Sequence, residues 1–149
     1  MNEDTYTHYL SLLTELLQIK SISTDPAFDG EIVKTAEWLA KTLESSGFTT
    51  EIISGYGNPI VYAHYEVDPE AETVLIYGHY DVQPASINDG WKSDPFVLSE
   101  RDGRLFGRGV VDNKGQFMIY VAVIKELIAA KNLKYNIKFV IEGDEETGG

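Results

Sequence analysis

The sequence contains no cysteine, few basic residues and no long hydrophobic run. Without cysteine there is no disulfide framework, no thiol nucleophile, no iron–sulfur cluster and no cysteine-ligated zinc site. The longest apolar run, residues 117–124, is far shorter than the ~18 residues that a membrane-spanning helix needs. The acidic N-terminal stretch MNEDTYTHYL lacks the positive charge of a signal peptide. These absences predict a cytoplasmic protein with no membrane partner.

Positive charge is also scarce, because 24 acidic residues face 12 basic ones and the formal net charge of the 149 residues is −12. Nucleic acids and anionic membranes bind through clustered lysine and arginine, so this surplus of carboxylates argues against both as partners. Cations are the more natural ligands. Since cysteine is absent, any metal must be held by histidine and carboxylates. The length predicts one domain, residues 1–149.

Hydrophobic periodicity predicts alternating helices and strands. The predicted helices cover residues 4–20, 32–43 and 113–131, and the predicted strands cover residues 48–54, 60–67, 73–79 and 135–141. The turn-forming segment DPEAE predicts a hairpin between the strands at 60–67 and 73–79. A second hairpin is predicted at 96–106, and residues 80–95 are predicted to be a long surface loop. The expected fold is α/β: a layered domain with a mixed β-sheet flanked by helices.

Three polar clusters stand where predicted strands end, and each has a purely structural alternative. His79 and Asp81 point to the same side of an extended chain, so Asp81 can accept a hydrogen bond from a metal-binding His79. The alternative is a half-exposed histidine beside a turn. Asp112 stands at the start of the third helix, where it could equally cap that helix.

The third cluster, EGDEETG, follows the last predicted strand and contains the pair Glu145 and Glu146. Adjacent carboxylates on a loop can point in different directions, so one can bind a metal while the other moves a proton. Short acidic runs are also common as solvated turns. Taken together, one histidine, one aspartate and a glutamate pair at strand ends supply ligands for Zn²⁺ or Mn²⁺ and predict a metal-dependent hydrolase.

Four segments in series, GHYDVQPA, GWKSDPF, RDGRLFGRGVVDNKGQ and EGDEETGG, closely resemble the N-terminal catalytic half of a two-metal peptidase family. That family includes carnosine-type dipeptidases, aminoacylases and glutamate-releasing carboxypeptidases, and the dipeptidase branch is nearest. The resemblance covers residues 1–149 and implies a zinc-peptidase-like catalytic domain that hydrolyses peptide or amide bonds. It also implies two divalent metal ions, with Zn²⁺ as the first choice and Mn²⁺ or Co²⁺ as alternatives.

The resemblance also implies a role for each candidate residue. His79 ligates one metal, and Asp81 orients His79. Asp112 is the carboxylate that both ions share, and the peptide bond between Asp112 and Asn113 is expected to be cis. Glu145 is the general base, and Glu146 ligates the second metal.

Members of that family continue past the last matched motif with a further acidic ligand, a lid domain that makes dimer contacts and a late histidine ligand. The sequence therefore predicts a truncated, N-terminal part of a catalytic domain. Each metal would have two protein ligands, where a catalytic zinc normally has three, so little hydrolase activity is expected from these residues alone. The sheet is expected to have an unpaired edge or an exposed apolar face that invites association, and full-length relatives are expected to be homodimers.

The expected substrate is a dipeptide. Two alternatives remain open at this point. One is deacylation of N-acyl amino acids by the same residues. The other is a non-catalytic domain that keeps the fold for binding or assembly, although an intact Glu145 argues against it.

Overall fold

A computed structural model describes residues 2–148, so the two ends of the predicted domain, Met1 and Gly149, lie outside the described residues. Within residues 2–148, three helices and six strands follow each other, together with three short 3-10 helices. In chain order, the helices and strands are α1 Glu3–Gln18, α2 Asp29–Glu44, β1 Thr49–Ile53, β2 Ile60–Tyr65, β3 Thr73–His79, β4 Ser99–Arg101, β5 Arg104–Phe106, α3 Lys114–Ala129 and β6 Asn136–Glu142.

Four of the strands form a mixed sheet in the order β1-β2-β6-β3. The pairs β1/β2 and β2/β6 are antiparallel, whereas β3 and β6 are parallel. The predicted hairpin between the strands at 60–67 and 73–79 is therefore wrong, since β6 lies between them. The reason is the crossover through α3, which returns the chain parallel to β3 and inserts β6 into the sheet, a pairing that no local turn signal reveals.

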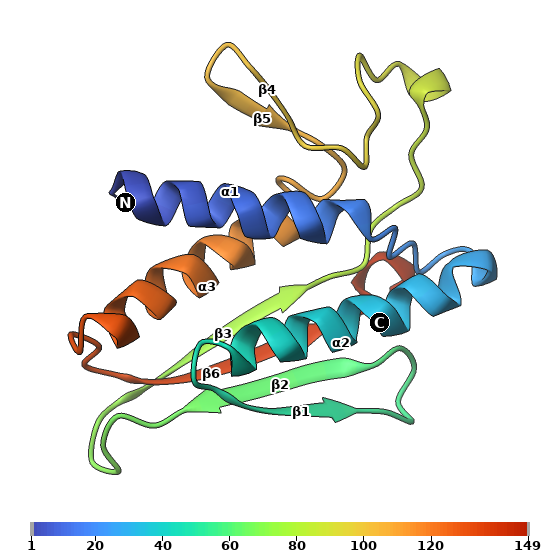
Figure 1. Ribbon diagram of the computed structural model, residues 1–149. Helices are drawn as coiled ribbons and strands as arrows, with labels where there is room; N and C mark the ends of the chain where they lie inside the picture. The colour runs from blue at the N-terminus through green and yellow to red at the C-terminus, as the bar shows by residue number, and fades with distance from the viewer. Residues whose placement is uncertain (1, 149) are drawn as a thin grey trace.

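The helices cover one face of this sheet (Figure 1). Helix α1 packs on α3, and α2 packs on β1 and β2. The core lies between the two layers, and it includes Leu13, Leu16, Leu17, Leu39, Leu43, Val61, Ala63, Phe117, Phe139 and Ile141. Two apolar side chains of the helices, Tyr6 in α1 and Val33 in α2, are exposed, because each lies at the margin of the apolar face of its helix. The prediction of a layered α/β domain with a mixed sheet is confirmed.

Strand β3 forms one edge of the sheet and is unusually apolar for that position. Leu75 is 63% exposed, and Val74 and Tyr77 are also exposed. No strand within residues 2–148 pairs with the outer edge of β3. The expected unpaired edge is therefore present. Exposed edges normally carry charges or prolines that prevent association, whereas this edge strand exposes apolar side chains.

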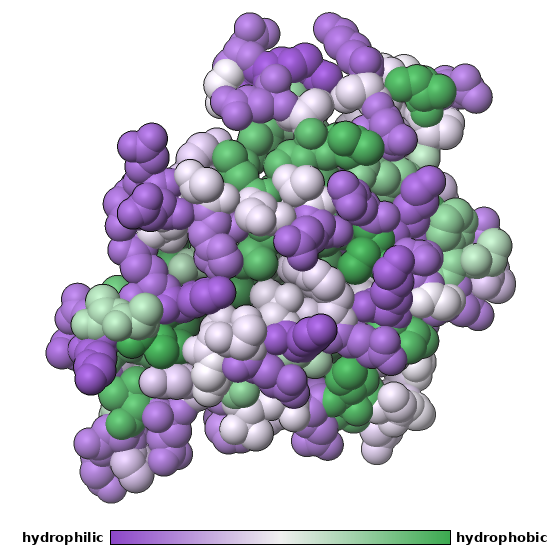
Figure 2. All heavy atoms as spheres, viewed as in Figure 1, coloured by the Kyte–Doolittle hydropathy of each residue, from purple (hydrophilic) through white to green (hydrophobic). Residues whose placement is uncertain are grey.

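The predicted hairpin at 96–106 is confirmed as β4 and β5, which form a separate two-stranded sheet that turns at Asp102 and Gly103. This hairpin projects beyond α1 (Figure 1). Figure 2 shows hydrophobic side chains gathered between the hairpin and α1, and Leu98 and Leu105 pack there against the main core. The hairpin is therefore joined to the domain by apolar contacts.

The segment after β3 is only partly the surface loop that its composition predicts. Tyr80, Asp81 and Val82 are fully buried. Val82 forms a single β-bridge to Ile22, and its backbone N–H donates to the carbonyl of Ser21. This contact joins the residues that follow His79 to the segment that follows α1. None of the helices between residues 2 and 148 is long and apolar enough to cross a membrane.

Candidate metal centre

The candidate residues gather at the carboxyl ends of the parallel strands β3 and β6. His79 is the last residue of β3 and lies opposite Glu142, the last residue of β6. Ligands of α/β sheets bind at this end of the strands, because the loops that follow them meet there. A Cβ on Gly78 would lie only 2.7 Å from Asn113 Oδ1. Glycine at this position therefore lets the loop before α3 approach the strand end.

The His79 ring is buried and has an acceptor on each nitrogen. Its Nδ1 lies 3.2 Å from the carboxylate Oδ1 of Asp81 and 3.2 Å from the Asp81 carbonyl oxygen. Its Nε2 lies 2.9 Å from Oδ1 of Asp112 and 3.9 Å from Oε2 of Glu145. Because Asp81 engages Nδ1, Nε2 is the ring atom that faces the other carboxylates, as in histidines that ligate metals.

The two buried partners shift each other's pKa. Burial by itself lowers the pKa of His79, but hydrogen bonds to Asp81 and Asp112 outweigh it and raise the pKa to about 9. Burial by itself raises the pKa of Asp81, but hydrogen bonds from His79, Ser23 and the Glu146 backbone outweigh it and hold the pKa below its ordinary value. The site thus concentrates negative charge around Nε2, which favours a cation.

Asp112 does not cap helix α3. The N-cap position is occupied by Asn113, without a side-chain capping bond, and the Asp112 side chain is 72% exposed with Oδ1 directed at His79. The capping alternative is therefore wrong. The peptide bond between Asp112 and Asn113 is cis, as expected. Asn113 Oδ1 accepts a hydrogen bond from the His79 backbone N–H at 3.2 Å, which ties this loop to the end of β3.

Glu145 and Glu146 lie in the 3-10 helix Glu145–Thr147, directly after β6. One ligand atom from each of His79, Glu145 and Glu146 lies within 4.8 Å of the other two. Nitrogen from histidine and oxygen from carboxylates are the donors that zinc takes when cysteine is absent. The donor set therefore fits a divalent cation. Asp112 joins this group through its contact with His79.

Several polar residues that no sequence motif indicates as site residues hold the segment of Glu145 and Glu146, the glutamate loop, in place. Gln83 Nε2 donates to the Glu146 carbonyl and to Glu146 Oε2, both at 3.0 Å. Asp81 Oδ2 accepts from the Glu146 backbone N–H at 3.0 Å and from the Ser23 hydroxyl at 2.7 Å. Gln83 lies inside the motif GHYDVQPA, but its contact partner is more than sixty residues away, so no local pattern indicates it.

A second set of hydrogen bonds, the Asn58 clamp, holds Asp144, the residue before Glu145. Asn58 donates to Asp144 through its backbone N–H at 2.6 Å and through Nδ2 at 2.7 Å. Its Nδ2 also donates to the Gly143 carbonyl at 2.8 Å. The Tyr80 hydroxyl donates to the neighbouring Pro59 carbonyl at 2.7 Å. The loop after β1 therefore supports the loop after β6.

Lys114 is buried completely beside Asp112, at the start of α3. Its Nζ donates to the carbonyl oxygens of Leu16 and Ile19, at 3.1 and 2.8 Å. Burial lowers the pKa of Lys114 to about 7. These bonds join the end of α1 to the start of α3, immediately next to the candidate site.

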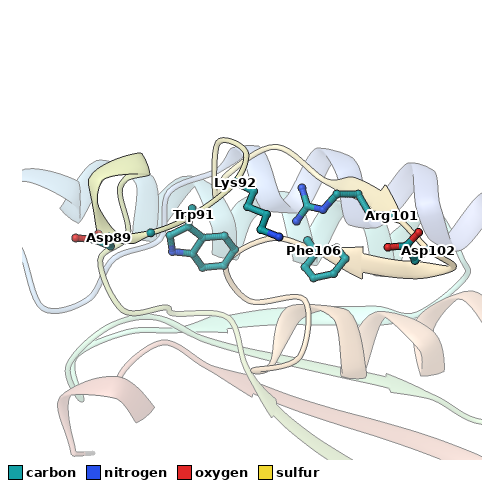
Figure 3. Close-up of a pocket in the computed structure, with 7 residues that line it drawn as sticks. Asp89, Trp91, Lys92, Arg101, Asp102 and Phe106 are labelled. Carbon is teal, nitrogen blue, oxygen red and sulfur yellow. The ribbon is translucent and has the colours of Figure 1, made fainter.

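A separate hollow of about 440 Å³ lies between the β4–β5 hairpin and the loop before it. Figure 3 shows Lys92 reaching toward the hairpin, between Trp91 and Arg101. The Arg101 guanidinium lies 4.0 Å above the Phe106 ring. We call the residues gathered around His79 the His79 group, namely His79, Asp81, Asp112, Glu145 and Glu146. None of the residues that line this hollow belongs to it.

Comparison with known proteins decides the family of the chain. Residues 75–149, half of the chain, match peptidase family M20/M25/M40. The chain belongs to peptidase family M20/M25/M40. The family resemblance inferred from the motifs is therefore confirmed, and the mixed sheet flanked by helices agrees with it.

Individual M20 relatives align with nearly the whole chain. Human Beta-Ala-His dipeptidase is 38% identical over 154 residues, which cover 94% of this chain and 30% of that protein. Succinyl-diaminopimelate desuccinylase from Buchnera aphidicola is 36% identical over 145 residues, which cover 97% of this chain and 36% of that protein. The solved structure of a di-peptidase from Saccharomyces cerevisiae superimposes with a TM-score of 0.90 at 30% identity, covering 98% of this chain and 34% of the other. The chain thus spans about a third of the length of each relative.

Proposed function

We propose that this M20 chain is the metal-binding part of a hydrolase of peptide and amide bonds, with dipeptides as the preferred substrates. The observation that carries the proposal is the convergence of His79, Glu145 and Glu146, whose ligand atoms lie within 4.8 Å of one another, with Asp112 2.9 Å from His79 Nε2. These residues come from three separate segments, namely the end of β3, the loop before α3 and the 3-10 helix after β6, and packing alone has no need to gather them.

In the proposed centre, His79, Asp112 and Glu146 would hold two divalent metal ions, and Asp112 would serve as a ligand for both. Zn²⁺ is the first choice, with Mn²⁺ and Co²⁺ as alternatives. The bound ions supply Lewis acidity and lower the pKa of water. Asp81 keeps Nδ1 of His79 hydrogen-bonded at 3.2 Å, so that Nε2 is the ligand atom.

Glu145 is the proposed general base. Its side chain is about half exposed, and its Oε2 lies 3.9 Å from His79 Nε2, so it borders the metal ligands while water and substrate still reach it. A carboxylate in this position takes a proton from the attacking water and returns it to the leaving amine. A domain kept only for binding has no need of such a group, which disfavours the non-catalytic alternative.

Two substrate classes are supported by the comparisons. The similarity to human Beta-Ala-His dipeptidase and to the yeast di-peptidase favours dipeptides. The similarity to a succinyl-diaminopimelate desuccinylase favours N-acyl amino acids as the second candidate. Both reactions break an amide bond, so the same catalytic residues serve either one.

His79, Asp112 and Glu146 would supply two protein ligands for each ion, whereas a catalytic zinc normally has three. We therefore propose that the 149 residues alone bind metal but hydrolyse substrates only weakly. Dimer formation, the additional ligands and a cytoplasmic location stay predictions.

Calorimetric titration of the purified chain with Zn²⁺ and Mn²⁺ tests the proposal. We expect metal binding that His79→Ala weakens strongly, whereas Glu145→Gln retains affinity to within about threefold, because a general base need not coordinate metal. Hydrolysis of β-Ala-His and of an N-succinyl amino acid is measured in parallel. A chain that binds neither metal contradicts the proposed centre, and enzyme-like turnover by these residues alone contradicts the incomplete ligand set.

A further inference from the structure

The side chain of Gln83 makes two hydrogen bonds to a single residue, Glu146. Its Nε2 lies 3.0 Å from the Glu146 backbone carbonyl and 3.0 Å from the carboxylate atom Oε2. Both partners are oxygen acceptors, so the amide NH₂ group must face them and the orientation of the amide is unambiguous. Gln83 is half-buried, which limits competition from water for these bonds.

The hydrogen bond to Oε2 restricts the rotation of the Glu146 carboxylate, which must stop rotating when it binds a metal ion. The terminal torsion of a glutamate is broad, so a free Glu146 would present its two oxygens in many directions. A carboxylate offers about four acceptor positions, so a single N–H on Oε2 restricts rotation and leaves the other positions available to a cation. The bond to the backbone carbonyl alone would secure the loop. The bond to Oε2 acts on the ligand group itself.

The neighbouring residue Asp81 shows that the same short segment serves both sides of the centre. Asp81 Oδ1 faces His79 Nδ1 at 3.2 Å, while Asp81 Oδ2 accepts the Glu146 backbone N–H at 3.0 Å. Residues 81–83 therefore contact two proposed ligands through separate groups. Asp81 contacts the imidazole of His79 and the backbone N–H of Glu146. Of Asp81 and Gln83, only Gln83 reaches the Glu146 carboxylate in the described part of the chain.

We propose that Gln83 is a positioning residue for Glu146: its amide holds the carboxylate in the orientation that the second metal ion requires. This inference rests on the proposed function, in which Glu146 is a metal ligand. Residues that hydrogen-bond to metal ligands typically change metal affinity by about 10- to 100-fold when they are removed. Gln83 should act on the ion held by Glu146 and leave the ion held by His79 unaffected.

The test is a double-mutant cycle measured by calorimetric titration with Zn²⁺. Gln83→Met keeps the length and flexibility of the side chain but has no N–H donor. We expect it to weaken one of the two binding events by about 10- to 100-fold and to leave the other within about twofold. In a Glu146→Gln background, the same substitution should change affinity by less than about twofold, because its target is already absent. The matched control is Gln18→Met at the exposed end of α1, which should change neither event.

The outcomes separate this inference from the proposed function. If the wild-type chain binds no Zn²⁺, the metal centre itself is wrong. If the wild-type chain binds two ions and Gln83→Met binds them equally well, Gln83 has no positioning role. An equal loss at both sites, or an undiminished loss in the Glu146→Gln background, would show a general structural effect and overturn the inference. If Gln83→Met does not fold by circular dichroism, Gln83→Asn replaces it, since its amide is one methylene too short to keep both bonds, and the same selective loss is expected.

Discussion

The His79 group and the hollow under the β4–β5 hairpin are both polar regions, but they are built in different ways. The hollow is lined only by residues between positions 89 and 106, so one continuous stretch of chain makes it (Figure 3). The His79 group joins His79 to Asp112, which is 33 positions away along the chain, and to Glu145 and Glu146, which are 66 and 67 positions away. The size of a hollow therefore says little about chemistry in this protein, whereas polar contacts between distant segments mark the site.

The two regions also differ in how their charged groups are used. Around the hollow, Arg101 donates to the nearby hydroxyls of Ser93 and Ser99 and stacks on Phe106, contacts that stabilise the hairpin itself. In the His79 group, the buried Asp81 faces Nδ1 of the buried His79, and His79 Nε2 faces the exposed carboxylate of Asp112. Only the second arrangement concentrates charge of one sign, as a cation site requires.

The largest effect is expected when the same isosteric change is made in both regions. Asp112→Asn should weaken Zn²⁺ binding on the order of 100-fold or more, since it neutralises a proposed ligand and even the partners of ligands are worth about 10- to 100-fold. Asp102→Asn, at the hairpin turn, should leave affinity unchanged. Titration calorimetry compares them. Equal affinities for the two variants would break the distinction between the regions.

An intermediate effect is expected from the clamp that supports the glutamate loop. Asn58→Ala removes the bonds from Nδ2 to Gly143 and Asp144 and should lower the free energy of unfolding by about 1 to 3 kcal/mol, because the acceptors lose their partners. Urea denaturation measures this change, with the exposed Asn132→Ala as the control. Zn²⁺ affinity should fall as well. A loss of stability with unchanged affinity would mean that the clamp serves the fold and not the site.

The smallest effect is expected in the hollow. Arg101→Ala removes the stacking on Phe106 and two hydrogen bonds to hydroxyls, and it should lower stability by no more than about 1 kcal/mol, since exposed cation–π contacts are weak. Zn²⁺ affinity should not change. A clear loss of metal binding in this variant would show that the hairpin and the metal centre are coupled and that the two regions are not independent.

Much of the local structure could be predicted from the sequence. The bounds of β3 were predicted without error, and α1, α3 and the β4–β5 hairpin were placed to within a few residues. The pairing of β2 with β3 was wrong, because strand neighbours depend on where a crossover helix returns the chain. The burial of Tyr80, Asp81 and Val82 was also missed, since these residues form hydrogen bonds with Ser21 and Ser23, which lie far earlier in the chain, just after α1.

The site shows the same division. His79, Asp112, Glu145 and Glu146 carry chemistry that their residue types and motifs reveal, and the pairing of His79 with Asp81 follows from alternation along an extended chain. Gln83, Asn58 and Ser23 have no such signal, because an amide or a hydroxyl is common in any loop. Their importance lies in the oxygen atoms they contact, which belong to residues far away in the sequence.

The sequence by itself determined the kind of chemistry: no thiolate, an excess of carboxylates, and four motifs of one peptidase family, since residue types and short-range spacing are properties of the chain alone. Only the tertiary structure decided that β6 lies beside β3 and that Asp112 faces His79 instead of capping α3. It also decided that Gln83 and Asp81 together hold Glu146. These features depend on distances between remote segments, and those distances are settled when the sheet and helices pack around a common core.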